Sequence, residues 1–270
     1  MEALRDLGWL LVNVWHALFT VVWSVLCMSV ATTAALLGFQ RFAFLAAPRA
    51  WAPGLFWACG VRVDVRGLER LARAPHCVVV VNHQSMIDIP ALQLGLAMPL
   101  RFVTKKELMA VPFLGHFMRA VGMIAIDRGN TAEGIERLKD QARRMKDDLA
   151  CVVSFAEGTR SRTGEIKPFR KGAFMLAIEA GMPVVPVSIE GARRCLPPDG
   201  FRVRPGVIRI DVGEPIPTDG LTIADRDALM KCAHRAVVEM NVAAGGLGEG
   251  SIAFAVGGAR GGATVRPRMN

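Results

Sequence analysis

The sequence predicts an α/β fold, in which a largely parallel central sheet of about seven strands is flanked by helices, with an N-terminal hydrophobic membrane helix or helical hairpin. Two observations predict it. Short runs of β-branched residues alternate with helical patterns, which is typical of a parallel sheet covered on both faces. A long apolar stretch without charges lies near the N-terminus, and the remainder reads as an ordinary soluble domain.

The strand candidates are short runs rich in Val and Ile, at 61–65, 77–81, 101–104, 123–126, 151–155, 184–189 and 207–212. Helical patterns separate most of them. The clearest lies at 131–149, where Ile135, Leu138, Ala142 and Met145 recur at three- and four-residue steps, and another covers 226–241. Ligands of such sheets bind beyond the carboxyl ends of the strands. Polar residues directly after a strand are therefore the candidates for a site.

The apolar stretch covers residues 7–40, 34 residues without Asp, Glu, Lys or Arg. As one helix it would reach roughly 50 Å, beyond a hydrocarbon core of about 30 Å. Two arrangements fit: a single tilted span, or a hairpin that dips into one leaflet with 42–57 as its second arm. Pro48, Arg49 and Pro53 make that second arm a poor span but suit an interface. Both arrangements remain open.

We expect three parts: a membrane-anchoring helical segment at 1–59, an α/β domain at 60–241, and a flexible Gly-rich tail at 242–270. A cleaved signal peptide fits less well, because the apolar run is too long and Glu2 and Asp6 precede it. Arginines follow the segment, which predicts a cytoplasmic domain. Six widely separated cysteines without a C-x-x-C pair also indicate a reducing compartment.

The net charge is +9, of which residues 1–60 contribute only +1. A basic domain surface suits anionic lipid, a phosphorylated substrate or nucleic acid, or serves solubility alone. No zinc-finger spacing and no basic-aromatic ribonucleoprotein motif is present, so nucleic acid is not an expected partner. No cluster of residues has metal-ligand spacing, so no metal is expected either.

The first site candidate follows the run 77–81, where His83 and Asp88 lie five residues apart at a strand-to-helix turn. Across such a turn the Asp can fold back and accept a hydrogen bond from Nδ1–H of the His, as in hydrolytic triads. The other ring nitrogen is then available as a general base toward an alcohol. The alternative is structural: Ser85 and Asp88 as a capping box, or Asp88 as an N-cap before Pro90.

The second candidate follows the run 151–155: Glu157, Gly158, Thr159 and Arg160. Small residues and arginines beyond a strand end can cradle an anion through backbone N–H groups and guanidinium. The alternative is a polar surface turn. It is not a Walker loop, since no Lys-Ser/Thr follows, and the chain has no G-x-S-x-G elbow of an α/β-hydrolase.

Taken together, these segments resemble the glycerolipid acyltransferase family. Residues 82–88 resemble its first motif, N-H-x4-D, and 122–128, which end in Arg128, resemble its second. Residues 155–161 resemble the third motif, F-P-E-G-T-R-S, with Ala156 in place of the usual Pro, and 183–187 resemble the fourth. All four occur in family order, and the similarity spans roughly 60–215. The bacterial 1-acylglycerol-3-phosphate acyltransferases are the closest subgroup.

The resemblance implies a role for each matching residue. His83 would be the general base and Asp88 would orient it. The glycerol phosphate acceptor would be bound by Lys105, Arg128, Glu157, Gly158, Thr159 and Arg160. The acyl chain would pass from acyl-CoA or acyl carrier protein to the sn-2 hydroxyl of 1-acyl-glycerol-3-phosphate, giving phosphatidic acid, without a cofactor.

The resemblance also implies a setting: phospholipid biosynthesis on the cytoplasmic face of a membrane, the bacterial inner membrane in this subgroup. The alternative acceptor is another lysolipid, such as lyso-ornithine lipid or a zwitterionic lysophospholipid. The alternative from another class is a membrane-anchored lipid-binding scaffold with a dead site. The intact pair of His83 and Asp88 disfavours the scaffold, because scaffolding does not need it.

Overall fold

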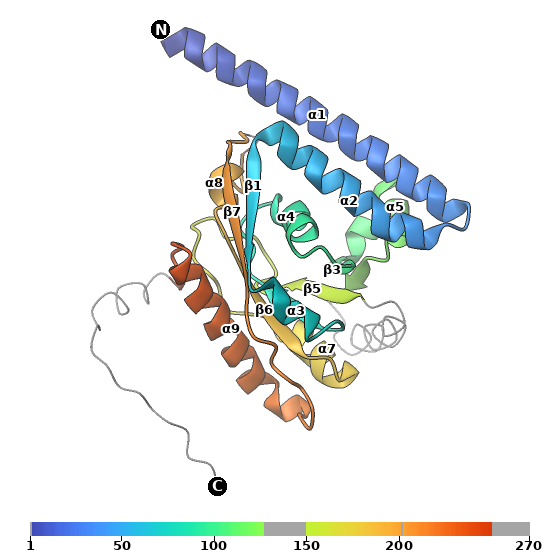
Figure 1. The fold of residues 1–270 in the computed structure, drawn as a ribbon, viewed down its shortest axis with the longest axis vertical. Helices are drawn as coiled ribbons and strands as arrows, with labels where there is room; N and C mark the ends of the chain where they lie inside the picture. Colours follow the sequence, from blue (N-terminus) through green and yellow to red (C-terminus); the bar gives the residue numbers. More distant parts are fainter. Residues whose placement is uncertain (1, 127–149, 201, 250–270) are drawn as a thin grey trace.

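The structure is a computed structural model that describes residues 2–126, 150–200 and 202–249. Its central sheet has seven strands in the order β1-β7-β6-β2-β5-β3-β4. Their bounds are β1 Val61–Arg66, β2 Val78–Val81, β3 Leu100–Lys105, β4 Ile124–Ile126, β5 Cys151–Phe155, β6 Val184–Glu190 and β7 Gly206–Val212. Figure 1 shows this sheet with helices on both sides and a long helical pair at one end. The predicted fold class is confirmed.

Five of the strands, β2 to β6, run in one direction. β7 runs antiparallel to β6, and β1, the edge strand, pairs in parallel with β7, so β1 and β7 are reversed relative to the other five. The carboxyl ends of β2 to β6 therefore lie on one edge of the sheet, which we call the carboxyl rim. β1 begins at this same end, directly after α2, so the rim faces the helical pair (Figure 1).

The helices are α1 Glu2–Leu36, α2 Gln40–Cys59, α3 Leu68–Ala72, α4 Asp88–Gly95, α5 Leu114–Ala120, α7 Gly172–Ala180, α8 Ala192–Cys195 and α9 Arg226–Ala243, with short 3₁₀ helices at Lys106–Ala110 and Ile223–Asp225. The side chains of β2 alternate between two cores. Val79 and Val81 pack with α2 and α4, and Val78 and Val80 pack with α7 and α9. All four valines are fully buried, as expected for a strand covered on both faces.

α1 and α2 form a hairpin that reverses at Gly38. Two indoles hold its arms together: Nε1 of Trp23 donates to the carbonyl of Trp51 at 3.1 Å, and Nε1 of Trp51 donates to Oγ of Ser24 at 2.9 Å. Gly54 is needed at the crossing, because a Cβ there would collide with the Trp23 indole. The second arm expected at 42–57 is thus present as α2.

α1 is the one described helix that is long and apolar enough to cross a membrane, over Gly8–Leu36. At 1.5 Å per residue these 29 residues reach roughly 40 Å, more than a bilayer core of about 30 Å. Its large apolar side chains, such as Leu11, Leu18 and Val21, are exposed. A core helix of a soluble protein would bury them, so this surface indicates membrane association.

α2 has a second role that the sequence did not reveal. Its side chains Ala52, Phe56 and Cys59 are buried in the core on the α4 side of the sheet. Val203 N–H, in the loop before β7, also donates to Oδ1 of Asn13 on α1 at 3.1 Å. The hairpin therefore contacts the domain through the last two turns of α2 and through Asn13 of α1, so the segment predicted at 1–59 shares part of its core with the domain.

The region predicted as a tail starts later than residue 242. α9 ends at Ala243, and the residues after it contact the domain: Ile166 N–H donates to Gly248 O at 2.7 Å, and Gly248 N–H donates to Oδ1 of Asn241 at 3.2 Å. Asn241 is fully buried, so its side chain organises this segment. The rest of the predicted tail, and the helix predicted at 131–149, lie outside the described residues.

Candidate active site

His83 and Asp88 meet at the end of β2. Nδ1–H of His83 donates to Oδ2 of Asp88 at 2.7 Å. Asp88 is fully buried, and the His83 side chain is 16% exposed. None of the described residues hydrogen-bonds Nε2, so this nitrogen remains available to a substrate. The contact between the two side chains is the one predicted from the sequence.

Oδ2 of Asp88 accepts two more hydrogen bonds, from the backbone N–H groups of Gln84 and Ser85, at 2.7 and 2.8 Å. Asp88 is the first residue of α4, yet its carboxylate points back into the preceding loop. The bond from Ser85 N–H to Asp88 is one half of the predicted capping box. The other half is not formed, because the Asp88 N–H goes to the Ser85 carbonyl at 3.4 Å instead of the Ser85 hydroxyl. The three donors concentrate the negative charge on Oδ2, next to the imidazole that would become cationic in a proton transfer.

Asn82 fixes the strand end from which His83 projects. Its side chain pairs with the backbone of Ile189 in β6: Nδ2 donates to the carbonyl at 2.9 Å, and Oδ1 accepts from the N–H at 2.8 Å. The buried amide thereby continues the β2–β6 ladder by one step beyond Val81. The Asn of the first motif is therefore a structural residue that sets the direction of His83.

Phe155 is a site residue that the sequence analysis missed. Its ring stacks on the His83 imidazole, with centroids 3.8 Å apart and planes 19° apart. The strand register would have revealed it: Val81 pairs with Phe155, and His83 lies two residues after Val81, on the same face of the sheet. The stacked ring restricts the imidazole to the plane in which it meets Asp88.

Glu157 connects the two predicted segments. Its Oε1 accepts the backbone N–H of His83 at 2.8 Å, and Oε2 accepts that of Lys167 at 3.0 Å. A return bond closes the link, since Ser161 N–H donates to the His83 carbonyl at 2.7 Å. The Glu157 side chain is buried, with both oxygens engaged by backbone. It positions the loop that carries His83, and contact with an acceptor stays a prediction.

The other predicted binding residues have different places. Gly158 has φ +73°, and a Cβ there would collide with Arg170, so only glycine fits beside Glu157. Thr159 is exposed. Nη1 of Arg160 donates to the Pro198 carbonyl at 2.9 Å. Lys105 is the last residue of β3, in register with Ile126 of β4, and Arg128 lies outside the described residues.

A second feature missed by the sequence analysis is the loop after α8. Oγ of Ser85 donates to the Leu196 carbonyl at 2.6 Å, and Arg160 holds Pro198 as described above. This loop therefore packs against both the first and the third motif. Pro197 and Pro198 have side chains that neither hydrogen-bond nor ionise, so the sequence offered no chemical reason to assign them to a site. The position of the loop, after β6 and α8, was the one available signal.

Burial raises the pKa of the Glu157 carboxyl to about 7, against the opposing effect of the N–H groups of His83 and Lys167. Between about pH 4.5 and pH 7 the Glu157 carboxyl therefore keeps its proton in the folded protein and has lost it in the unfolded chain. This contribution to stability is fully present below the pKa of the unfolded chain, near 4.5, and is lost as pH rises through about 7. The full change is on the order of 3 kcal/mol.

We therefore expect the free energy of unfolding of wild type, relative to Glu157→Gln, to fall between pH 5 and pH 7.5. The Gln variant has no carboxyl to titrate, and its amide offers one acceptor to two N–H donors, which costs about 1–3 kcal/mol at every pH. Denaturant unfolding in detergent at the two pH values measures both effects. Parallel pH profiles for wild type and variant would contradict the assignment.

Comparison with known proteins follows the same segments. The family model described as Acyltransferase matches residues 62–190. The chain is 35% identical over 178 residues to 1-acyl-sn-glycerol-3-phosphate acyltransferase beta of Homo sapiens, covering 66% of this chain and 64% of that protein. It is also 35% identical over 161 residues to the 1-acyl-sn-glycerol-3-phosphate acyltransferase of Pseudomonas aeruginosa, covering 60% and 62%. The matched part thus spans less than two thirds of these relatives.

Among solved structures, the 1-acyl-sn-glycerophosphate (LPA) acyltransferase PlsC from Thermotoga maritima superposes with a TM-score of 0.71. The alignment covers 86% of this chain and 94% of that one, at 24% sequence identity. This likeness concerns the fold, and it includes part of the hairpin, since 86% of the chain exceeds the length of residues 60–270.

Proposed function

Because the chain belongs to the acyltransferase family, we propose that it transfers a fatty acyl chain from a thioester donor to the sn-2 hydroxyl of 1-acyl-glycerol-3-phosphate, giving phosphatidic acid. The observation that carries the proposal is the pair of His83 and Asp88 on the carboxyl rim. The His83 ring stacks on Phe155, which packs against the core on the α2 side of the sheet, the side of the apolar hairpin from which a membrane-borne acceptor would arrive.

In this mechanism Nε2 of His83 takes the proton of the acceptor hydroxyl as its oxygen attacks the thioester carbonyl. The buried carboxylate of Asp88 stabilises the imidazolium that forms. The tetrahedral intermediate then expels the thiolate, which receives the proton from His83, so the ester and the free thiol are the products. The chain thereby returns to its initial protonation state.

The transfer is direct in this proposal, because the nearby nucleophiles are otherwise engaged. The Ser85 hydroxyl donates to the Leu196 carbonyl. The thiols of Cys77 and Cys151 contact each other at 3.0 Å, buried within the sheet. None of these three groups is placed to receive an acyl chain from a donor at Nε2 of His83.

The phosphate of the acceptor would be bound by three cations: Lys105 at the end of β3, Arg160 after β5, and Arg128, which follows β4 in sequence and lies outside the described residues. We expect Arg160→Ala to raise KM for lysophosphatidic acid by about 10–150-fold, the worth of one charged hydrogen bond. KM for the acyl donor should change far less. Steady-state kinetics with each substrate varied in turn measure the two constants.

Arg235→Ala is the matched control, since Arg235 is an exposed arginine on α9, outside the site. Equal rates of the wild type on lysophosphatidic acid and on an uncharged monoacylglycerol would show that no phosphate is read. A strong preference for lyso-ornithine lipid would assign the chain to the alternative acceptor. The same lysolipid panel, with a thioester donor and the full chain in detergent, tests the proposed activity itself.

The hairpin would anchor the domain to the cytoplasmic face of a membrane, the inner membrane if the source is a bacterium. Deleting residues 1–37 removes α1 and keeps α2, whose buried Phe56 the core requires. We expect this truncation to lower the fraction of protein that sediments with membranes, and to preserve turnover of detergent-dispersed acceptor. Sedimentation assays and turnover rates measure the two. Complete sedimentation of the truncated chain would place the anchor elsewhere.

A further inference from the structure

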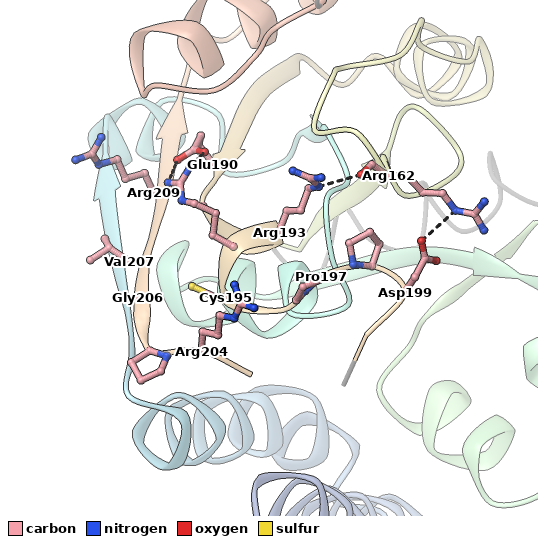
Figure 2. Close-up of a pocket in the computed structure, with 14 residues that line it drawn as sticks. Arg162, Glu190, Arg193, Cys195, Pro197, Asp199, Arg204, Gly206, Val207 and Arg209 are labelled. Carbon is pink, nitrogen blue, oxygen red and sulfur yellow. Dashed lines mark hydrogen bonds and ion pairs between the residues drawn. The ribbon is translucent and has the colours of Figure 1, made fainter. Parts of the chain in front are cut away.

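A cavity of about 730 Å³ adjoins the site on the β6 side, and five arginines line it: Arg162, Arg193, Arg194, Arg204 and Arg209. It lies among α8, the loop that follows α8, and the beginning of β7, at the carboxyl end of β6 (Figure 2). Neither the motifs nor the proposed mechanism uses it. Only two carboxylates, Glu190 and Asp199, line the same cavity.

Those two carboxylates are already paired. Both oxygens of Glu190 accept from Arg194, at 2.6 and 2.7 Å, and Asp199 lies 3.3 Å from Nε of Arg162. Three arginines are left without a carboxylate partner among the described residues. All three line the same hollow, and such a concentration of like charge favours a bound anion.

Two of these three guanidinium groups are held in place. Nε of Arg193 donates to the Arg162 carbonyl at 2.9 Å, and Nη1 of Arg209 donates to the Ala244 carbonyl at 3.0 Å. Backbone carbonyls orient a guanidinium without cancelling its charge, and each group keeps further N–H donors for a ligand. The backbone N–H of Arg204 donates to the Cys195 carbonyl at 2.8 Å, and its guanidinium makes no hydrogen bond or ion pair with any described residue (Figure 2).

The cavity shares a wall with the active site. The loop that begins at Leu196 contributes Pro197 and Pro198 to the cavity, and its carbonyls accept from Ser85 and Arg160 on the other side. A ligand whose anionic end lies in the cavity would therefore have only this loop between that end and the active site. The donor thioester must reach the same place for transfer to occur.

We infer that this cavity binds the phosphates of the coenzyme A part of an acyl-CoA donor, an inference that rests on the proposed function. Coenzyme A carries a diphosphate and a 3′-phosphate at the end opposite its thiol, so three unpartnered arginines suit it. A lysophosphatidate carries one phosphate, which Lys105, Arg128 and Arg160 would bind under the proposed function. The cavity volume lies within the range typical of small-molecule sites. The arginines line a hollow, which suits coenzyme A, whereas an acyl carrier protein would need a broad surface to bind.

The test compares donors that differ only in phosphates: acyl-CoA, and acyl-pantetheine with the same acyl chain and no phosphate. We expect R193A/R204A in the full chain to raise KM for acyl-CoA by at least about 10-fold, as expected for lost charged hydrogen bonds. KM for acyl-pantetheine, KM for lysophosphatidic acid and kcat should stay near wild type. R204E should have a larger effect than R204A, and R235A should have none.

Calorimetric binding of free coenzyme A to the detergent-solubilised chain, without acceptor, provides a readout independent of turnover. The Kd should rise at least about 10-fold in R193A/R204A. A double variant with wild-type KM and Kd for the coenzyme would overturn the inference and leave the proposed function standing. A selective loss of turnover with acyl carrier protein, or of affinity for lysophosphatidic acid, would also overturn it. A wild-type chain that binds coenzyme A but turns over no thioester would overturn the proposed function instead.

Discussion

Replacing His83 with alanine is expected to lower kcat by about 10²–10⁴-fold, the range that a positioned general base contributes. Nε2 is the imidazole nitrogen left open to a substrate, while Glu157 and Ser85 are engaged with backbone groups and Asp88 is fully buried. Turnover should fall with both donors and with every lysolipid, because the step that is lost is common to all of them. Single-turnover rates with saturating substrates measure the effect.

The variant also removes the ring that stacks on Phe155 and one of three donors to the buried Asp88. A thermal unfolding curve is therefore part of the experiment, and His116→Ala, an exposed histidine on α5, is its control. The two backbone N–H groups of Gln84 and Ser85 remain on Asp88, so the fold should persist. A folded His83→Ala protein with near wild-type turnover would remove the central claim of the mechanism.

Asp88→Asn is expected to lower kcat by roughly 10²–10³-fold and to leave KM for both substrates nearly unchanged. In hydrolytic triads the same change costs about 10⁴-fold, because the amide imposes the wrong imidazole tautomer. Here two backbone N–H groups point at the Oδ2 position, so the amide oxygen should occupy it and keep the tautomer. What is lost is the negative charge that stabilises the imidazolium.

The same substitution should reduce stability. Oδ1 of Asp88 is buried and has no hydrogen-bond partner among the described residues, so an amide NH2 in its place would be unsatisfied, at a cost of about 1–3 kcal/mol. Denaturant unfolding measures this cost separately from kcat. A loss of stability with kcat unchanged would show that Asp88 serves the fold alone. A 10⁴-fold loss of kcat would show that the amide does impose the wrong tautomer on the His83 imidazole.

The strands and the contact of His83 with Asp88 were predictable because both rest on local pattern. Valine-rich runs mark buried strands, and a five-residue spacing across a turn permits one geometry of contact. The direction of β7 was not predictable in this way, since an apolar run reads the same for either strand direction. Its pairing with β1 joins segments about 140 residues apart in sequence, and that register is set by the packed sheet.

The role of Glu157 was equally hidden. In sequence it stands among glycine and arginine, which suggests ligand contact, and only the fold brings its carboxylate to the N–H groups of His83 and Lys167. The arginine cavity has the same origin. Its cations are scattered between residues 162 and 209, without a motif, and they meet because α8 and the following loop fold over the end of β6.

The packing of α2 against both α1 and the sheet has a kinetic consequence. A domain on a loose tether would sample many heights above a bilayer and meet its lipid substrate as a solute. A domain held by a helix shared with its own core keeps one orientation, and its acceptor is supplied from within the plane of the lipid. For such an enzyme the governing concentration is the surface density of acceptor, so inert lipid added to the same vesicles would slow it at constant total substrate.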